Sequence, residues 1–345
     1  MKVVYLEPKS SFIGERIHSD TLFGAICWGI RQVYDKETLE NILRKFKNGK
    51  PPFLLSSTYP YITTKETEKK THFLPKPMQK PLKKEINSRE DLDKLKELKK
   101  LTFLPETIFN KYINRELTDE DFFNGITLHP TKYLLDGEEY AQEGSVLIES
   151  ESAYRLFKTT SVQRNAINRL TNSTEGMLFY DSETFFSQDV GLYFLLKMFG
   201  NDEKIINAAL SFLQDRGIGG DISTGKGCFR IPPISDFNGI NEPDNADACT
   251  TLSLYYPTSN EINYFRDHKD RLWYSIVRRR GKIESAFVDV EKVWKDSFKM
   301  FSEGSTFPLI ERHEIYGMNP IVKQQPFDVQ QYGHAYMVKI VGGEK

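Results

Sequence analysis

The sequence predicts an α+β protein built from two βαββαβ-type units. In each half of the chain, strand-like segments alternate with amphipathic helical segments, and each half ends on a strand. Residues 235–247 separate the halves, because they are acidic, rich in Asn, Pro and Gly, and without apolar periodicity. The 345 residues are enough for two domains of ordinary size. This order favours two α+β units over a doubly wound sheet.

The first half begins with a predicted strand at residues 2–6. A helix is predicted over 19–33, with Ser19 as its N-cap and apolar residues at helical spacing. Residues 53–59, bounded by prolines, are predicted to form the next strand. Residues 63–125 are rich in Lys and Pro and contain one helical stretch, 88–101. We interpret them as an insertion, because their apolar residues are too few for an independent core.

Strands resume at residues 139–149 and 176–180. A helix is predicted from an N-cap at Asn201 to a C-terminus at Gly217, a residue that commonly ends helices. The strand 228–231 follows and is stopped by two prolines. In the second half, strands are predicted at 250–256, 272–278 and 336–341, and a helix at 290–301.

The composition is typical of a soluble globular protein, with 39% hydrophobic and 28% charged residues. No apolar run approaches the roughly 18 residues of a membrane-spanning helix, and the N-terminus turns polar too early for a secretory signal. Three widely spaced cysteines fit a reducing cytoplasm. The six histidines form no metal-binding pair, so we predict neither a metal site nor a cofactor.

The net charge is only −1, but the charge is uneven along the chain. Residues 76–115 hold eleven Lys and Arg against six Asp and Glu, and residues 155–170 hold four basic and no acidic residues. Residues 278–282 form a third basic cluster. This pattern suits a protein that binds an anion on one side and protein partners on another, with solvated basic faces as the alternative.

The segment DRGIGGDISTGKGCFRIPP, residues 215–233, nearly matches the nucleotide-binding P-loop pattern G-x-x-x-x-G-K-[ST]. A P-loop follows a strand and opens a helix, whereas this loop follows a predicted helix and precedes a strand. A helix dipole would therefore present its negative end to a phosphate. Gly227 also lacks the hydroxyl that binds magnesium. Both misfits argue against an ATP site.

The same loop can bind phosphates in another way. Its glycines allow positive φ and close approach of the backbone, so that successive amides can form an anion-binding nest. Hydroxyl groups and two cations add further donors. The residues concerned are Arg216, Gly217, Gly219, Gly220, Ser223, Thr224, Gly225, Lys226 and Gly227. We predict that this loop binds the phosphates of an extended nucleic-acid strand, with a turn that binds nothing as the alternative.

A second donor-rich run, RNAINR, lies at residues 164–169. Arg164 and Arg169 can contact phosphates or stack on bases, and Asn165 and Asn168 can read a base through paired donor and acceptor groups. The alternative is a polar turn with structural hydrogen bonds.

A helix, a glycine-rich loop and a last strand in a duplicated βαββαβ protein resemble the RAMP superfamily of CRISPR RNA-binding proteins. Further runs narrow the resemblance to subunit four of the type III-A Csm effector complexes. They occur in the expected order over nearly the whole chain: IHSDTLFG at 17–24, FLPKP at 73–77, RNAINR at 164–169, TEGMLFY at 174–180 and QYGHAY at 331–336.

The resemblance implies two ferredoxin-like (RRM-related) domains in tandem, at residues 1–240 and 245–345. The first would carry the thumb and interface insertion at about 63–125 and the glycine-rich loop at 216–227. The implied function is that of a non-catalytic, cytoplasmic subunit in antiviral defence. It would hold the 5′ handle of the CRISPR RNA and contact the large polymerase/cyclase-type subunit and the first backbone subunit. His18, Ser19, the 164–169 run and the glycine-rich loop would contact the RNA.

The alternative within the same superfamily is a metal-independent RNA endonuclease. Some RAMP relatives use a histidine near the first helix as general acid or base, and His18 has that position. The neighbouring Ser19 and Asp20 are natural helix-capping residues, which favours RNA contact or capping over cleavage. Two further features stay open. Arg278–Arg280 could touch RNA or a partner, and phenylalanines near the insertion could stack on bases or pack in the core: Phe103, Phe109, Phe122 and Phe123.

Overall fold

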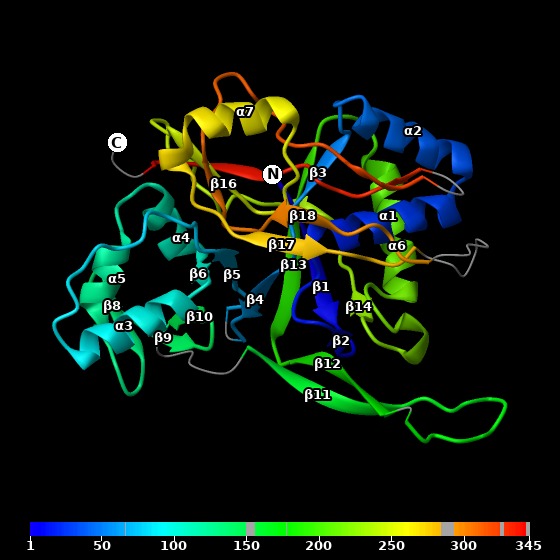
Figure 1. Ribbon diagram of the computed structural model, residues 1–345, viewed down its shortest axis with the longest axis horizontal. Coiled ribbons are helices and arrows are strands. Elements are labelled where there is room, and N and C mark those ends of the chain that lie inside the picture. Colours follow the sequence, from blue (N-terminus) through cyan, green and yellow to red (C-terminus); the bar gives the residue numbers. More distant parts are fainter. Residues whose placement is uncertain (66, 150–155, 177, 284–292, 325–327, 343–345) are drawn as a thin grey trace.

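The computed structural model describes residues 1–345 except 66, 150–155, 177, 284–292, 325–327 and 343–345. Arg155 of the second basic stretch and Met177 of the TEGMLFY run therefore lie outside the described residues. Within them the chain is a mixed α+β fold with seven α-helices and a twelve-stranded sheet (Figure 1). The helices are α1 (Ser19–Val33), α2 (Lys36–Lys47), α3 (Arg89–Lys100), α4 (Glu106–Ile113), α5 (Asp119–Gly125), α6 (Glu203–Arg216) and α7 (Ser259–Asp267). None of these seven is long and apolar enough to cross a membrane.

The centre of the large sheet is the antiparallel pair β1 (Lys2–Pro8) and β13 (Val190–Met198). On one side, β13 pairs with β3 (Phe53–Leu55) and β4 (Tyr59–Thr63); on the other, β1 pairs with β14 (Phe229–Arg230) and β15 (Ser235–Asp236). Apart from the long segment between β4 and β13, the order of elements along the chain is therefore β–α–β–β–α–β. The first and third of these strands, β1 and β13, lie in the middle of this part of the sheet.

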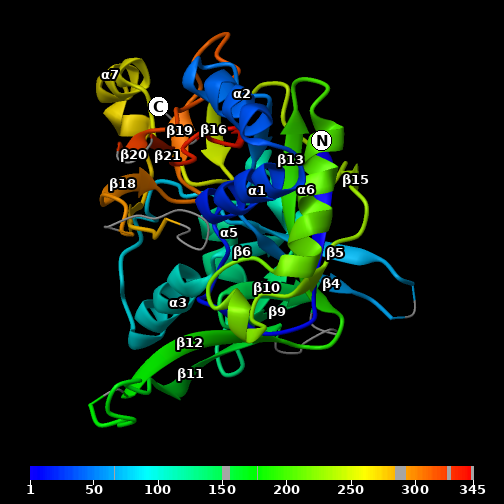
Figure 2. The same cartoon turned by 90° about the vertical axis from the view of Figure 1, so that its right-hand side faces the viewer.

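Helices α1 and α6 cover one face of this sheet (Figure 2). Because side chains of a strand alternate between faces, Val4 of β1 packs against these helices while Val3 belongs to the core on the other face. A Cβ on Gly29 of α1 would lie 3.0 Å from the Cβ of Ala209 of α6. Small residues thus let the two helices pack closely.

The sheet continues beyond β4 into the lysine-rich segment. Its further strands, in spatial order, are β5 (Lys70–Pro75), β6 (Phe103–Pro105), β10 (Val146–Glu149), β9 (Glu138–Glu143), β8 (Lys132–Leu135) and β7 (Ile126–Thr127). Helices α3 to α5 flank these strands (Figure 1). Phe73 and Leu104 of this segment lie in one core with Val3 and Tyr193. The segment has abundant buried apolar residues despite its polar composition, and it extends the central core rather than forming one of its own.

A long hairpin formed by β11 (Phe157–Asn165) and β12 (Leu178–Phe186) extends away from the body (Figures 1 and 2). At its base, β12 pairs with the short strand β2 (Phe12–Ile13). Most side chains of the outer half are exposed.

In the second half, β16 (Ala248–Thr251) lies between β19 (Thr306–Pro308) and β22 (Met337–Ile340). Two further pairs are β17 (Ile276–Arg279) with β18 (Phe298–Phe301), and β20 (Ile321–Lys323) with β21 (Val329–Gln330). Cys249, Phe265 and Phe307 form part of a separate small core.

The helix predicted over 290–301 is wrong in its described part. Residues 298–301 form β18, and residues 290–292 lie outside the described residues. The buried Met300 follows the exposed Lys299, which is the alternation of a strand rather than the spacing of a helix. Two helix starts also shift by one residue. His18, not Ser19, is the N-cap of α1, and Asp202, not Asn201, is that of α6.

Candidate nucleic-acid-binding groove

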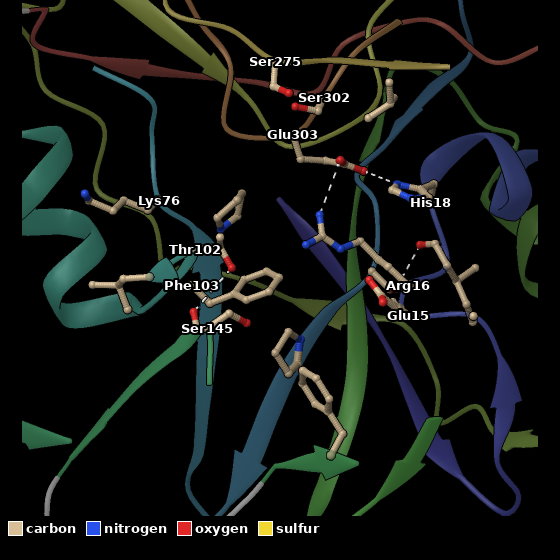
Figure 3. Close-up of a pocket in the computed structure, with 18 of the residues that line it drawn as sticks. Glu15, Arg16, His18, Lys76, Thr102, Phe103, Ser145, Ser275, Ser302 and Glu303 are labelled. Carbon is tan, nitrogen blue, oxygen red and sulfur yellow. Dashed lines mark hydrogen bonds and ion pairs between the residues drawn. The ribbon is translucent and has the colours of Figure 1, made fainter. Parts of the chain in front are cut away.

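A cavity of about 1340 Å³ lies where four parts of the chain meet, and we call it the groove (Figure 3). Its walls are the connection from β2 to α1, the β5–α3–β6 part of the insertion, the base of the β11–β12 hairpin and the β17–β18 ribbon. Gly219 and Gly220 of the glycine-rich loop complete the lining. The groove therefore joins segments from both halves of the chain.

The polar end of the groove is organised by Glu303, which is almost fully buried. His18 Nδ1 lies 2.7 Å from one carboxylate oxygen, Arg16 Nη1 lies 3.4 Å from the other, and the Ser57 hydroxyl donates a short hydrogen bond (Figure 3). Burial alone would raise the pKa of Glu303. The hydrogen bond and charge of His18, the charge of Arg16 and the Ser57 bond outweigh burial and lower this pKa to about 2. Glu303 is thus a fixed anion that orients His18 and Arg16.

Other cations of the groove are also partly neutralised. Lys76 Nζ lies 2.5 Å from Asp119, and Arg279 forms a two-pronged ion pair with the buried Asp20. Lys99 at the end of α3 is exposed and has no ion pair among the described residues. Lys99 is therefore the lysine of the groove with the most available charge.

Apolar lining lies beside the Glu303 cluster. The Arg16 guanidinium, which faces Glu303, also lies 4.8 Å from the centroid of the Phe103 ring (Figure 3). The other apolar lining residues come from the insertion and the hairpin base: Pro75, Pro77, Leu98, Phe157 and Phe186. The four phenylalanines that could stack on bases or pack in the core, Phe103, Phe109, Phe122 and Phe123, are all buried core residues, and among them Phe103 also lines the groove. Apolar lining beside polar lining suits unpaired bases joined to phosphates.

The glycine-rich loop follows α6 and precedes β14, which confirms the local order that argued against a P-loop. Its base is closed by two backbone hydrogen bonds of 2.8 Å, from the Ile218 amide to the Gly227 carbonyl and from the Gly227 amide to the Ser11 carbonyl. Gly227 has a φ of +66°, and a Cβ there would clash with the Ile218 carbonyl. Only glycine therefore allows this closure.

The amides at the tip of this loop are free. Residues 219–223 donate no backbone hydrogen bond to any described residue, whereas the amides of Thr224 to Cys228 are all used. Gly219 and Asp221 have positive φ, a conformation that can turn successive amides to one side. The tip is exposed, and its first two glycines face the groove. It can accept an anion without displacing an internal hydrogen bond.

Arg164 and Lys226, two predicted RNA-contacting cations, meet at Glu183 instead of lining the groove. Lys226 Nζ lies 2.6 Å from one oxygen of this buried carboxylate, and Arg164 Nη2 lies 2.5 Å from the other. The Ser11 hydroxyl donates a further bond of 3.0 Å. The hydrogen bond from Lys226, helped by those from Ser11 and Arg164, lowers the pKa of Glu183. In this structure both cations hold the loop to the hairpin base.

The remaining predicted residues are divided between the interior and the hairpin end. Ser19 is fully buried and its hydroxyl accepts the Leu254 amide, so its side chain cannot reach a ligand in the groove. Asn165 and Arg169 are exposed at the far end of the hairpin, and Asn168 closes a turn there by accepting the Leu170 amide. This end lies six residues, about 20 Å, beyond Thr159 in the groove wall. Ser223 and Thr224 are exposed on the loop, and Arg216 is half-buried.

Sequence reasoning missed Arg16, Lys99 and Glu303. Arg16 is two residues from His18 and could have been included in that motif. Nothing in the sequence connects Glu303 with His18, 285 residues earlier. Among the described residues no cluster of His, Cys, Asp and Glu could hold a metal ion.

Comparisons with known proteins agree with this architecture. The RAMP superfamily model matches residues 2–230, and the CRISPR Csm4 C-terminal domain model matches residues 244–340. A curated relative, the CRISPR system Cms protein Csm4 of Methanocaldococcus jannaschii, is 26% identical over 320 residues, which cover 83% of this chain and 80% of the relative.

Two solved structures have a similar fold. The Csm3–Csm4 subcomplex of the type III-A CRISPR-Cas interference complex contains a chain with a TM-score of 0.67 at 20% identity, covering 98% of this chain and 99% of that one. The Csm1–Csm4 cassette with AMPPNP contains a chain with a TM-score of 0.58 at 18% identity, covering 100% and 99%. The chain belongs to the RAMP superfamily and, within it, groups with the CRISPR Csm4 proteins.

Proposed function

We propose that the groove binds single-stranded RNA and that its biological ligand is the 5′ handle of a CRISPR RNA. The observation that carries this proposal is the row of amides at residues 219–223, which have no hydrogen-bond partner among the described residues and border a groove with polar and apolar lining. Free amides and Lys99 would take the phosphates, and the half-buried rings of Phe157 and Phe186 in the apolar lining would take unstacked bases.

The predicted residues have different roles in this proposal. Gly219, Gly220, Ser223 and Thr224 would contact the RNA directly, as would His18 through the edge of its ring that does not face Glu303. An indirect role, holding the glycine-rich loop in the conformation that binds RNA, would fall to Arg164, Gly217 and Lys226. Asn165, Asn168 and Arg169 at the hairpin end would meet a more distant part of the RNA, and Arg216 would add positive charge behind the loop.

We further propose that the chain is a non-catalytic subunit of a type III effector complex in the cytoplasm. Its partners would be the large polymerase/cyclase-type subunit and the first backbone subunit, because similar chains occur in Csm1–Csm4 and Csm3–Csm4 assemblies. The two halves, residues 1–240 and 245–345, would each be a ferredoxin-like domain. The strand arrangement around β1 and β13 and the limits of the two family models support this division.

The salt dependence of RNA binding tests the groove. Replacing Lys99 with Ala should weaken binding of a short single-stranded RNA and make the slope of log K against log salt about 0.7 less steep, as expected for one lost phosphate contact. Lys96→Ala is the matched control, because Lys96 lies on the same helix, pairs with Asp93 and does not line the groove. Equal effects of the two variants would contradict the groove as the RNA site.

The identity of the RNA needs a second experiment. The chain can be purified from its host with its bound RNA, and the 5′ ends of that RNA sequenced. A handle-binding subunit should retain RNAs that share one 5′ sequence, whereas random 5′ ends would contradict handle recognition.

A second candidate function is RNA cleavage by His18. It is favoured by one observation, the 2.7 Å contact between His18 Nδ1 and Glu303 in the groove wall, since a buried carboxylate commonly orients a catalytic imidazole. Incubation with repeat-containing RNA in the absence of metal decides it. Cleavage that disappears in His18→Ala would establish this function, and intact RNA or cleavage that survives the substitution would exclude it.

A further inference from the structure

The β17–β18 ribbon has two faces with different surroundings (Figure 1). Ser275, Val277 and Arg279 line the groove. Because strand side chains alternate, Ile276 and Arg278 point to the other face, which we call the outer face of the ribbon. Ile276 is 51% exposed. No function assigned above uses this face.

The outer face concentrates positive charge. Arg278 and Lys299 are directly opposite each other in the register of the ribbon, and Arg280 and Lys282 follow along the chain. None of the four forms an ion pair with any carboxylate among the described residues. Like charges opposite each other destabilise a strand pair. An arrangement that costs stability and has no counter-charge among the described residues is suited to an anionic ligand.

An exposed indole lies at the end of this charged row. Trp294 is 48% exposed, with the Arg280 guanidinium 5.0 Å and the Lys282 ammonium 4.9 Å from its ring. The two cations hold the ring in place and would also neutralise the phosphate of a base stacked on it. At the other end, Tyr274 is 48% exposed. Exposed aromatic rings at the ends of a row of cations are typical of surfaces that bind single-stranded nucleic acid.

We infer that the outer face of the ribbon is a second binding surface for single-stranded RNA, with Trp294 as its stacking residue and Arg278, Arg280, Lys282 and Lys299 as its phosphate contacts. Successive outward residues of a strand are about 6.6 Å apart, which is comparable to the separation of phosphates in an extended single strand. The ribbon separates this surface from the groove, so the inference does not depend on the function proposed for the groove.

The test measures the affinity for an unstructured single-stranded RNA of about 16 nucleotides, which is long enough for an extended site. Trp294→Ala should weaken binding about tenfold, the loss expected when one stacked base is removed. Trp294→Phe should retain most of the affinity, because it keeps an aromatic ring. Lys269→Ala is the control for a lost surface charge, since Lys269 is exposed in the same half of the chain but outside the ribbon.

A substitution at Lys299 separates binding from folding. Lys299→Thr keeps a good strand former and removes one of the two facing charges. It should leave the thermal stability unchanged or raise it, while weakening RNA binding and making the salt dependence less steep by about 0.7. A purely structural ribbon would instead show unchanged RNA affinity in all ribbon variants, and that result would overturn the inference.

The RNA on this surface could continue from the groove or be a separate strand, and Lys99→Ala distinguishes the two. If the tenfold effect of Trp294→Ala persists in the Lys99→Ala background, the ribbon binds by itself; if it disappears, one strand runs over both surfaces. Polyglutamate serves as the probe for an acidic protein partner. Ribbon variants that weaken polyglutamate binding and leave RNA binding intact would also overturn the inference.

Discussion

Replacing Gly227 with Ala should open the base of the glycine-rich loop. A left-handed φ costs an alanine about 1–2 kcal/mol. In addition, the new Cβ would lie 3.0 Å from the Ile218 carbonyl carbon and still closer to its oxygen. The backbone must move apart there, which breaks the 2.8 Å hydrogen bond from the Ile218 amide to the Gly227 carbonyl. Losing a buried hydrogen bond adds about 1–3 kcal/mol, so the total cost is about 2–5 kcal/mol.

Gly225→Ala is the matched control. Gly225 also has positive φ, +81°, but an added Cβ would meet nothing within 4 Å. Gly225→Ala should therefore lower the free energy of unfolding only by the cost of the left-handed φ, about 1–2 kcal/mol. Thermal unfolding of both variants gives the stability difference, and titration with single-stranded RNA gives the affinity. We expect Gly227→Ala to be less stable and to bind RNA more weakly than Gly225→Ala. Equal behaviour of the two variants would refute the closed-loop geometry.

Three further predictions concern buried ionisable groups. Burial lowers the pKa of His334 from 6.5 to about 4, so the folded state keeps this ring neutral. The free energy of unfolding should therefore fall by about 3 kcal/mol as the pH drops from 7 to 4. Thermal melts of His334→Leu should lack this part of the pH dependence. Glu303→Gln should lower the free energy of unfolding at pH 7 by about 3 kcal/mol, because the pKa of Glu303 is near 2 in the folded state against an ordinary 4.5. This contribution is lost only as the pH falls from about 5 to 2. The difference in melting temperature between the variant and the wild type should therefore be smaller at pH 4 than at pH 7. Glu183→Gln should lower the melting temperature and weaken RNA binding measured by titration, because Lys226 loses the carboxylate that holds the loop to the hairpin base, while Arg164 keeps Asp181 and Asp221. Unchanged or stronger binding would contradict a role of this ion pair in shaping the loop.

Local patterns predicted many elements correctly. The helix over 19–33 has apolar residues at helical spacing, and α1 has those bounds. The helix predicted over 88–101 is α3, which begins after Ser88 with a capping box. The place of the glycine-rich loop between a helix and a strand was also predicted, because Gly217 ends α6 and Phe229 begins β14. These features depend on interactions between residues a few positions apart.

The composition of the insertion was less informative. Lysines dominate residues 76–115, yet Leu98, Phe103 and Phe109 are buried in the core that contains β1. Apolar residues spread among lysines do not show whether they face a core of their own or a neighbouring sheet. Similarly, the pattern around Phe298 and Met300 was compatible with a helix. In the structure these residues pair with β17 and form a strand.

The sequence alone determined the α+β class, the position of the glycine-rich loop and the basic run at 164–169. Only the tertiary structure decided which of these residues share a surface. It paired Lys226 and Arg164 with Glu183, and it placed Asn165 about 20 Å along the hairpin from the groove wall. It also brought Glu303 to His18 across 285 positions. The physical reason is that a charged side chain is neutralised by an opposite charge that the fold brings within a few ångströms. The residues adjacent in the sequence do not show which distant residue will supply that charge.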